Sequence, residues 1–311
     1  MPCLDVLSDY NRHQYYRDTP MIIPILSKLA SESLLSLYPI FVKKIGISMP
    51  LQLWTRLITY VAMASVFVDW KFVWSAIGST DSIMLALVNM LHVFFSYEGF
   101  RHLDSGVSFA IFNTYPLMIL LLAGVVWDNS YFLVLAGLAL FIYSNFNEGA
   151  LNKDFNEDPS AVLTPNFTYG LAMILLAALT EAFIYFLIRR VKTSNHWNHV
   201  FISYLLGAVL MTAYVVYTEY MTPNHTASLE AADKSRVGIA VLANGFIGSV
   251  GYFLRFFSSY RLDAAIYAPL SYFGVVMSYV YGIFFNDETL SVSKVAGTAC
   301  ILASNYFAPK M

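Results

Sequence analysis

The sequence predicts an all-α integral membrane protein, with ten transmembrane helices arranged as two inverted five-helix repeats. Three observations predict this class: an apolar composition, long uninterrupted apolar segments, and a repeat within the chain. Of the 311 residues, 58% are hydrophobic and only 12% are charged, whereas about 25% of the residues of a soluble domain are charged. The mean hydropathy is +0.59. A soluble core cannot bury this much apolar surface, so we expect the lipid bilayer to be part of the solvent.

Charge and cysteine content exclude several other classes. The formal net charge is -2 and the isoelectric point is near 6.3, so there is no electrostatic reason to expect nucleic acid as a partner. The two cysteines, Cys3 and Cys300, lie at opposite ends of the chain. They predict neither a disulfide framework nor a cysteine metal site. We therefore expect no metal and no cofactor.

Ten apolar segments are candidate membrane spans, because about 20 apolar residues are needed to cross roughly 30 Å of hydrocarbon. The segments are continuously apolar, as in Leu117–Ala123, and lack the alternation of polarity that a transmembrane barrel needs. We predict spans at 20–42, 49–69, 80–100, 105–127, 130–146, 166–189, 198–219, 236–257, 263–285 and 290–308.

The polar stretches divide the chain into four parts. A polar tail at 1–19, which does not resemble a secretory signal, precedes a first five-helix repeat at 20–146. A polar linker at 147–165 precedes a second repeat at 166–308.

The positive charges predict the orientation in the membrane. Arg189, Arg190 and Lys192 form the densest basic cluster, which places the loop after the sixth span in the cytoplasm. Both termini would then be cytoplasmic. The sequons at Asn166 and Asn224 would share the opposite face. The membrane itself, a plasma membrane or a eukaryotic endomembrane, stays open, as does a homodimer.

An internal repeat relates the two halves. With an offset of 159, Leu103 corresponds to Leu262, and the aspartates at 104 and 128 correspond to those at 263 and 287. After one inserted residue, Gly137 corresponds to Gly297 and Ser144 to Ser304. An odd number of spans per copy reverses the orientation of the second copy, which is the architecture of many secondary transporters.

Three stretches make the chain similar to a known superfamily. Pro50–Arg56 (PLQLWTR) has an arginine early in the second span, and the stretch 100–145 covers spans three to five. Residues 262–305 contain a small-residue helix with a proline, Glu288 in the turn, and a glycine-containing last helix. Over most of residues 20–308 the chain resembles the drug/metabolite transporter superfamily, in particular its EamA-like ten-helix permeases. One departure is that the first-half turn, Asp128-Asn129, lacks the glutamate.

The resemblance implies a secondary-active transporter of a small polar or amphipathic metabolite, working by alternating access with proton coupling or exchange. A nucleotide-sugar or organic-phosphate antiporter is an alternative, because such carriers belong to the same superfamily. A non-transporting receptor or membrane chaperone on a transporter fold is the alternative from another class. The spans contain neither a His-Glu-x-x-His nor a Gly-x-Ser-x-Gly motif, so we do not expect an enzyme.

Ionisable residues within the spans are the first candidates for the functional site. Lys28 and Glu32 are four residues apart and share a helix face. They form either an internal ion pair or a site for substrate or protons. Glu181 occupies the corresponding position in the second half, and is either a second such carboxylate or a partner in helix packing.

Further candidates are assigned less directly. Arg56 and Arg255 lie within spans, and each could snorkel to the interface, while Arg255 is also an anion-binding candidate. His92 is a proton-relay candidate or a core histidine. We thus predict substrate contacts at Glu32, Asn113, Tyr115, Glu181, Tyr185, Tyr267, Ser271, Tyr272 and Arg255, and proton coupling through Lys28, Glu32, Glu181 and His92.

Prolines and glycines in the spans have structural interpretations. Pro116 and Pro269 disrupt the hydrogen-bond ladder of their helices, which is tolerated beside a cavity or another helix. By resemblance, the fourth and ninth spans line the central cavity of the family. Gly245, Gly248 and Gly251 are expected to allow close helix packing.

Overall fold

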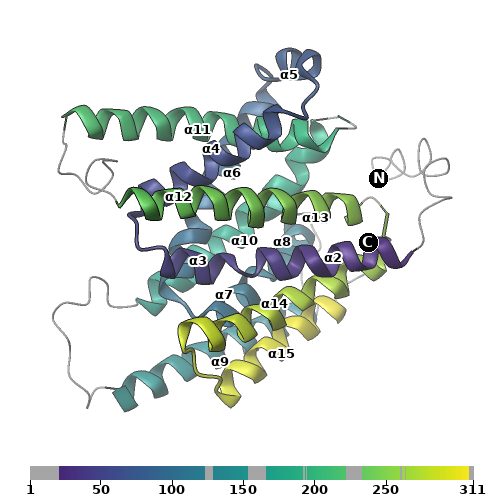
Figure 1. Cartoon of the computed structure of the whole chain (residues 1–311). Helices are drawn as coiled ribbons and strands as arrows, with labels where there is room; N and C mark the ends of the chain where they lie inside the picture. The colour runs from purple at the N-terminus through teal and green to yellow at the C-terminus, as the bar shows by residue number, and fades with distance from the viewer. Residues whose placement is uncertain are drawn as a thin grey trace.

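The computed structural model describes residues 21–122, 129–152, 166–191, 193, 195–221, 233–259, 261–262 and 264–307. Every regular element in these ranges is a helix, and no strand occurs among them (Figure 1). This confirms the predicted all-α class. The predictions for the tail at 1–19, for Asp128, Lys192, Asn224 and Asp263, and for most of the linker fall outside the described residues.

The described part of the first half of the chain forms eight helical segments. They are α2 (Ile22–Leu35), α3 (Tyr38–Lys44), α4 (Met49–Ser65), α5 (Trp70–Ala76), α6 (Thr80–His102), α7 (Ser105–Phe112), α8 (Tyr115–Leu122) and α9 (Asn129–Asn152). The described part of the second half forms seven more. They are α10 (Phe167–Arg190), α11 (His196–Met221), α12 (Lys234–Ala243), the π-helix η2 (Asn244–Val250), α13 (Gly251–Ser259), α14 (Ala264–Asn286) and α15 (Val292–Phe307).

Five helices of the described chain are long and apolar enough to cross a membrane. They cover Ile22–Lys44, Thr80–His102, Phe167–Ile188, His196–Met221 and Lys234–Arg255. Shorter apolar helices cover Phe132–Asn145, Leu270–Asn286 and Val292–Ser304. Within the described residues, helices thus occupy all ten predicted segments, and five of these segments reach spanning length and hydropathy.

Several predicted single helices are divided. The chain leaves the α-helix between α2 and α3, where Pro39 occupies the first turn of α3, and between α7 and α8, where Pro116 is the second residue of α8. Proline is favoured at such positions because its missing N–H would have no partner there. By contrast, α14 continues through Pro269, so the predicted disruption of the ninth span does not divide the helix.

One helix end and one additional helix differ from the prediction. Helix α9 continues to Asn152, so its last turns occupy the first part of the predicted linker. Helix α5 was not predicted, and its start is explained by Asp69, whose carboxylate accepts hydrogen bonds from the backbone N–H groups of Lys71 and Phe72.

Helices from the two halves alternate through the bundle. Helix α2 lies between α13 and α14, and α9 packs against α15 at the edge opposite α5 and α11 (Figure 1). The described start of α2 and end of α15 lie at the same end of the bundle (Figure 1).

Many contacts between halves keep the same pattern when the halves are exchanged. Three of them join corresponding helices: α4 with α11, α7 with α14, and α9 with α15. Several others come in equivalent sets. Contact of α6 with α10 corresponds to α2 with α13, contact of α2 with α14 to α10 with α7 and α8, and contact of α6 with α11 to α4 with α12 and η2.

Glycines at the α9–α15 contact bring the two backbones close together. A Cβ atom added to Gly137 would lie 2.7 Å from the carbonyl oxygen of Gly297, and one added to Gly297 would lie 2.9 Å from that of Gly137. These are the two glycines that the repeat aligns, so each meets its own counterpart. Close approach at small residues is a common means of packing membrane helices.

Candidate functional site: a polar cavity between the halves

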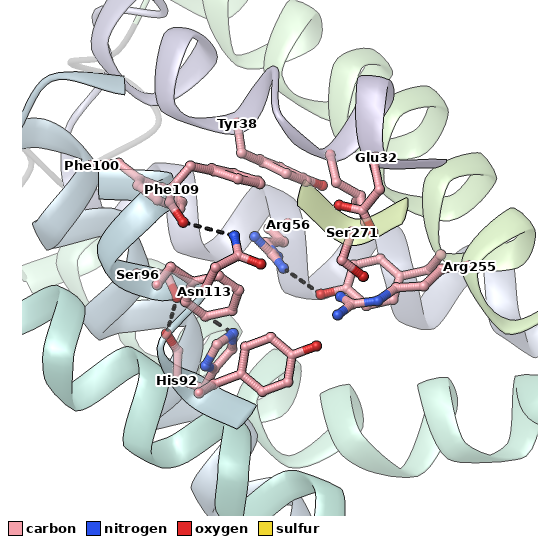
Figure 2. A pocket seen from close by; sticks show the side chains of 14 residues that line it. Glu32, Tyr38, Arg56, His92, Ser96, Phe100, Phe109, Asn113, Arg255 and Ser271 are labelled. Atoms are coloured by element: carbon pink, nitrogen blue, oxygen red, sulfur yellow. Dashed lines mark hydrogen bonds between the residues drawn. The ribbon is translucent and has the colours of Figure 1, made fainter. Parts of the chain in front are cut away.

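A cavity lies at the centre of the bundle, where α2, α3, α4, α6, α7 and α8 of the first half meet α13 and α14 of the second (Figure 2). The space open to the centres of water-sized spheres is about 50 Å³. A water molecule needs roughly 10–15 Å³ by this measure, so this conformation has room for a few waters, and a larger solute requires the helices to separate. Polar side chains line it at Glu32, Tyr38, Arg56, His92, Ser96, Asn113, Tyr115, Tyr252, Arg255 and Ser271. Apolar side chains line it at Leu35, Phe100, Phe109 and Phe112.

Lys28 and Glu32 form the first charged group of this region. The ammonium of Lys28 donates to the Glu32 carboxylate one helical turn away, and both residues are buried. The same ammonium lies 3.7 Å from the ring centroid of Tyr267 on α14. A Cβ added to Gly274 would lie 2.6 Å from Glu32 Oε2, so α14 packs directly over the pair. The predicted ion pair is therefore present, and its carboxylate also faces the cavity.

Glu181 forms a second charged group with partners from two other helices. Its Oε1 lies 3.8 Å from Arg255 Nη2, and its Oε2 lies 3.5 Å from His92 Nε2. Arg255 lines the cavity with a side chain that is 18% exposed, so it points inward and does not snorkel to the interface.

The ring nitrogens of His92 face Glu181 and polar groups of α6 and α10. Nδ1 of His92 lies 3.1 Å from the carbonyl oxygen of Ala177, which can only accept, so Nδ1 carries a proton. In a neutral imidazole Nε2 is then an acceptor, and the hydroxyl of Ser96 lies 3.4 Å from it.

Arg56 occupies the third charged position and is the main departure from the prediction. It does not snorkel, because the residue is only 4% exposed. Its guanidinium carbon lies 4.5 Å from the ring centroid of Tyr38, 5.2 Å from that of Tyr97 and 5.3 Å from that of Tyr60. Nη2 donates to the hydroxyl of Tyr204 at 3.3 Å and to that of Tyr252 at 3.5 Å. Five tyrosines thus surround the cation, and we call this group the tyrosine cage.

Hydrogen bonds and close packing hold the tyrosine cage in place. The hydroxyls of Tyr38 and Tyr60 are 2.7 Å apart, and Tyr60 stacks on Tyr204 with ring centroids 4.5 Å apart. Gly248 in η2 allows this arrangement, because a Cβ there would lie 2.0 Å from the Tyr60 hydroxyl. The predicted role in close packing is confirmed for Gly248 and for Gly251, where a Cβ would lie 3.0 Å from Leu35, but Gly245 makes only an ordinary contact at 3.4 Å. The π-helix that carries Gly248 was not predicted.

The break between α7 and α8 supplies further polar groups. Asn113 lies in this break and donates to the carbonyl oxygen of Phe109 at 2.8 Å, and Tyr115 lines the cavity just after it. Ser271 contributes from α14. The break predicted near Pro116 therefore does lie beside a cavity.

The structure does not bring all of the predicted site residues to the cavity. Glu32, Asn113, Tyr115, Arg255 and Ser271 line it, as does His92. Lys28, Glu181 and Tyr267 stand directly behind lining residues. Tyr185 and Tyr272 are not among the lining residues. Sequence reasoning missed the tyrosine cage, for which the only signal was the high tyrosine content, 22 of 311 residues.

A separate polar cluster joins helices at the end of the bundle where α14 turns into α15. Glu288 pairs with Lys43 of α3 at 2.6 Å. It also accepts hydrogen bonds from the backbone N–H and the hydroxyl of Ser105, both at 2.7 Å, at the N-terminus of α7. The glutamate singled out in the sequence thus ties the second half to two helices of the first. We call this cluster the Glu288 latch.

The membrane-length apolar helices indicate an integral, multi-pass membrane protein. Residues 168–308 match the model of the EamA-like transporter family. Over the second half of the chain, this match supports the resemblance to the drug/metabolite transporter superfamily, whose EamA-like members are generally transporters and not enzymes.

The comparison with solved structures extends the fold to nearly the whole chain. A structure titled only "Crystal structure of protein" covers 92% of this chain and 96% of its own, with 16% sequence identity and a TM-score of 0.50. An identity this low shows a similar fold and nothing about the solute. None of the curated proteins matches the chain.

Proposed function

We propose that this protein carries a small polar or amphipathic metabolite across the membrane by alternating access, with its two halves acting as inverted five-helix repeats. The observation that carries the proposal is the central cavity, which is lined by both halves and contains buried charged groups that packing alone does not need. Ionisable groups within membrane spans are rare and commonly mark the path of a solute or proton.

The packing of the halves supports the inverted repeat. Exchange of the halves reproduces the contact pattern between helices, and Gly137 and Gly297, related by the sequence repeat, touch each other. A residue can meet its own counterpart only close to a pseudo-two-fold axis. If that axis lies in the membrane plane, exchanging the conformations of the two halves turns an outward-open carrier into an inward-open one.

The Glu181 group supports proton coupling. His92 Nε2 lies 3.5 Å from Glu181 Oε2, close enough for the two groups to share a proton, and the same carboxylate faces Arg255. Loss of the proton would leave a neutral imidazole against a carboxylate and strengthen the attraction of Glu181 to Arg255. A solute that displaces Arg255 would favour the protonated state, so binding of solute and proton would be linked.

Flux measured in proteoliposomes tests this function. Solutes that raise the apparent unfolding temperature of the purified protein are offered to liposomes across a range of pH. We expect uptake by the unaltered protein, strongly slowed uptake by Glu32→Gln, and an altered pH profile for Glu181→Gln. Glu98→Gln is the matched control, because Glu98 is also a buried carboxylate but does not line the cavity.

Three outcomes would contradict parts of the proposal. Normal uptake by Glu32→Gln at every pH would remove Glu32 from the mechanism. An unchanged pH profile for Glu181→Gln would leave that residue with a packing role. Solute binding without flux would identify a receptor built on a transporter fold, and the carrier function would be rejected.

A further inference from the structure

The guanidinium of Arg56 has unsatisfied hydrogen-bonding capacity in the wall of the cavity. Arg56 lines the cavity, and the residue is only 4% exposed. Its Nε has no hydrogen-bond partner among the described residues. The two bonds that Nη2 donates to tyrosine hydroxyls are long, at 3.3 and 3.5 Å. A buried donor without an acceptor is costly, more so when it is charged.

Arg56 also lacks an anionic partner within the part of the chain that the structure describes. The carboxylate of Glu32 is paired with Lys28, and that of Glu181 lies against Arg255 and His92. No carboxylate of the described residues forms an ion pair with Arg56, whose nearest polar neighbours are tyrosines. Around the cavity the basic residues Lys28, Arg56 and Arg255 outnumber the carboxylates Glu32 and Glu181.

The tyrosine cage explains how this cation is tolerated in the absence of an anion. Aromatic faces attract a guanidinium, and the cage surrounds the cation with rings at 4.5–5.3 Å. The rings do not supply what the planar fork of arginine binds best, which is a pair of anionic oxygens. The apolar side chains of Phe100, Phe109 and Phe112 line the same cavity, so an anionic head and an apolar body can be bound together once the helices separate.

We propose that Arg56 is the anion-binding subsite of this cavity, and that the transported solute carries a carboxylate or a phosphate group which the Arg56 guanidinium binds, with its apolar part against the phenylalanines. This inference extends the carrier function proposed above, and it rests on that function in one respect, namely that the bound solute is also transported. Binding itself does not depend on transport. Arg255 is less suited to this task, because Glu181 already balances its charge.

Binding by purified protein in detergent tests the proposal with four matched probes. They are benzoate, phenyl phosphate, the neutral isostere benzamide, and the cation benzylamine, each titrated while the apparent unfolding temperature is followed. We expect stabilisation by at least one of the two anions and little by benzamide or benzylamine. The carboxylate and phosphate arms distinguish the two anionic groups. In Arg56→Gln we expect the favoured anion to bind roughly tenfold more weakly or worse, from the loss of a charged hydrogen bond.

Two further variants keep the test interpretable. Arg101→Gln removes an arginine that pairs with Glu98 away from the cavity, and it should leave anion binding unchanged. If Arg56→Gln does not fold, Arg56→Lys keeps the charge but not the fork, and it should weaken the favoured anion at least severalfold.

The results separate this inference from the carrier function. Equal stabilisation by benzoate, phenyl phosphate and benzamide in the unaltered protein would overturn the inference, as would full anion affinity in Arg56→Lys and Arg56→Gln. Arg56 would then be a cation that only packs the tyrosines together. Flux of neutral solutes without anion binding would leave the carrier function standing and this subsite rejected. If Arg56→Gln abolishes anion binding but the unaltered protein shows no flux, the subsite stands and the carrier function is rejected.

Discussion

Replacement of Glu288 tests how the end of the bundle near the α14–α15 turn is held closed. Its side chain is 9% exposed, and the Glu288 latch joins Lys43, the N-terminus of α7 at Ser105, and Asn286, whose Nδ2 donates to it at 3.3 Å. These partners come from three segments that are far apart in the sequence. Loss of one carboxylate therefore releases several contacts between the halves at once.

The structure sets the expected magnitude. Removal of an acceptor at a helix N-terminus costs about 1 kcal/mol, and breaking a buried ion pair costs about 3–5 kcal/mol. The Lys43 side chain is 21% exposed, so water replaces part of the lost interaction. We expect Glu288→Ala to destabilise the protein by about 3 kcal/mol. Glu288→Gln should lose about half of that, because its amide oxygen still accepts from the Ser105 N–H.

Thermal unfolding in detergent measures the effect, with a neighbouring residue as control. Asp287 is exposed and has a φ of 54°, a conformation that asparagine also adopts. Asp287→Asn removes the same charge from the same turn, and we expect a change within about 0.5 kcal/mol. A double-mutant cycle of Glu288→Gln with Lys43→Met should give a coupling energy of about 1–3 kcal/mol.

Two results would refute this reasoning. The first is a loss of stability in Asp287→Asn as large as that in Glu288→Ala, which would show that the charge of the turn matters and the latch contacts do not. The second is strict additivity in the double-mutant cycle, which would show that Lys43 and Glu288 do not interact.

Three other substitutions follow from close contacts and buried charge. Gly137→Val should destabilise by about 1–3 kcal/mol or more through overlap with the backbone of Gly297, while Gly78→Ala, which has open space around it, should show no such loss of unfolding temperature. Gly248→Ala should displace two tyrosine hydroxyls of the cage and weaken binding of the anionic probe, and unchanged affinity would mean that the cage tolerates the shift. Lys28→Met should cost about 3–5 kcal/mol by leaving a buried carboxylate unpaired, and neutralising that carboxylate in the same protein should recover most of the lost unfolding temperature.

Local patterns were enough to predict the helical class and one charged pair. Continuous apolar segments predicted where helices occur. Backbone N–H and C=O groups in lipid have no water to bond, and a helix satisfies all of them within one segment. The pairing of Lys28 with Glu32 followed from their spacing of four residues, since both lie on one face of a single helix. The latch residue Glu288 was also visible, as the acidic residue of the turn that carries the family resemblance.

Only the tertiary structure decided which distant groups meet. Arg56 could be assigned to a span but not to an interior, because the same long side chain can reach the interface or turn inward, and the tyrosines that surround it come from five helical segments. The contact of Glu181 with His92 and Arg255 likewise joins three helices. Such groups are brought together by helix packing, and packing depends on the whole set of side chains at each contact and not on the spacing of residues along one helix.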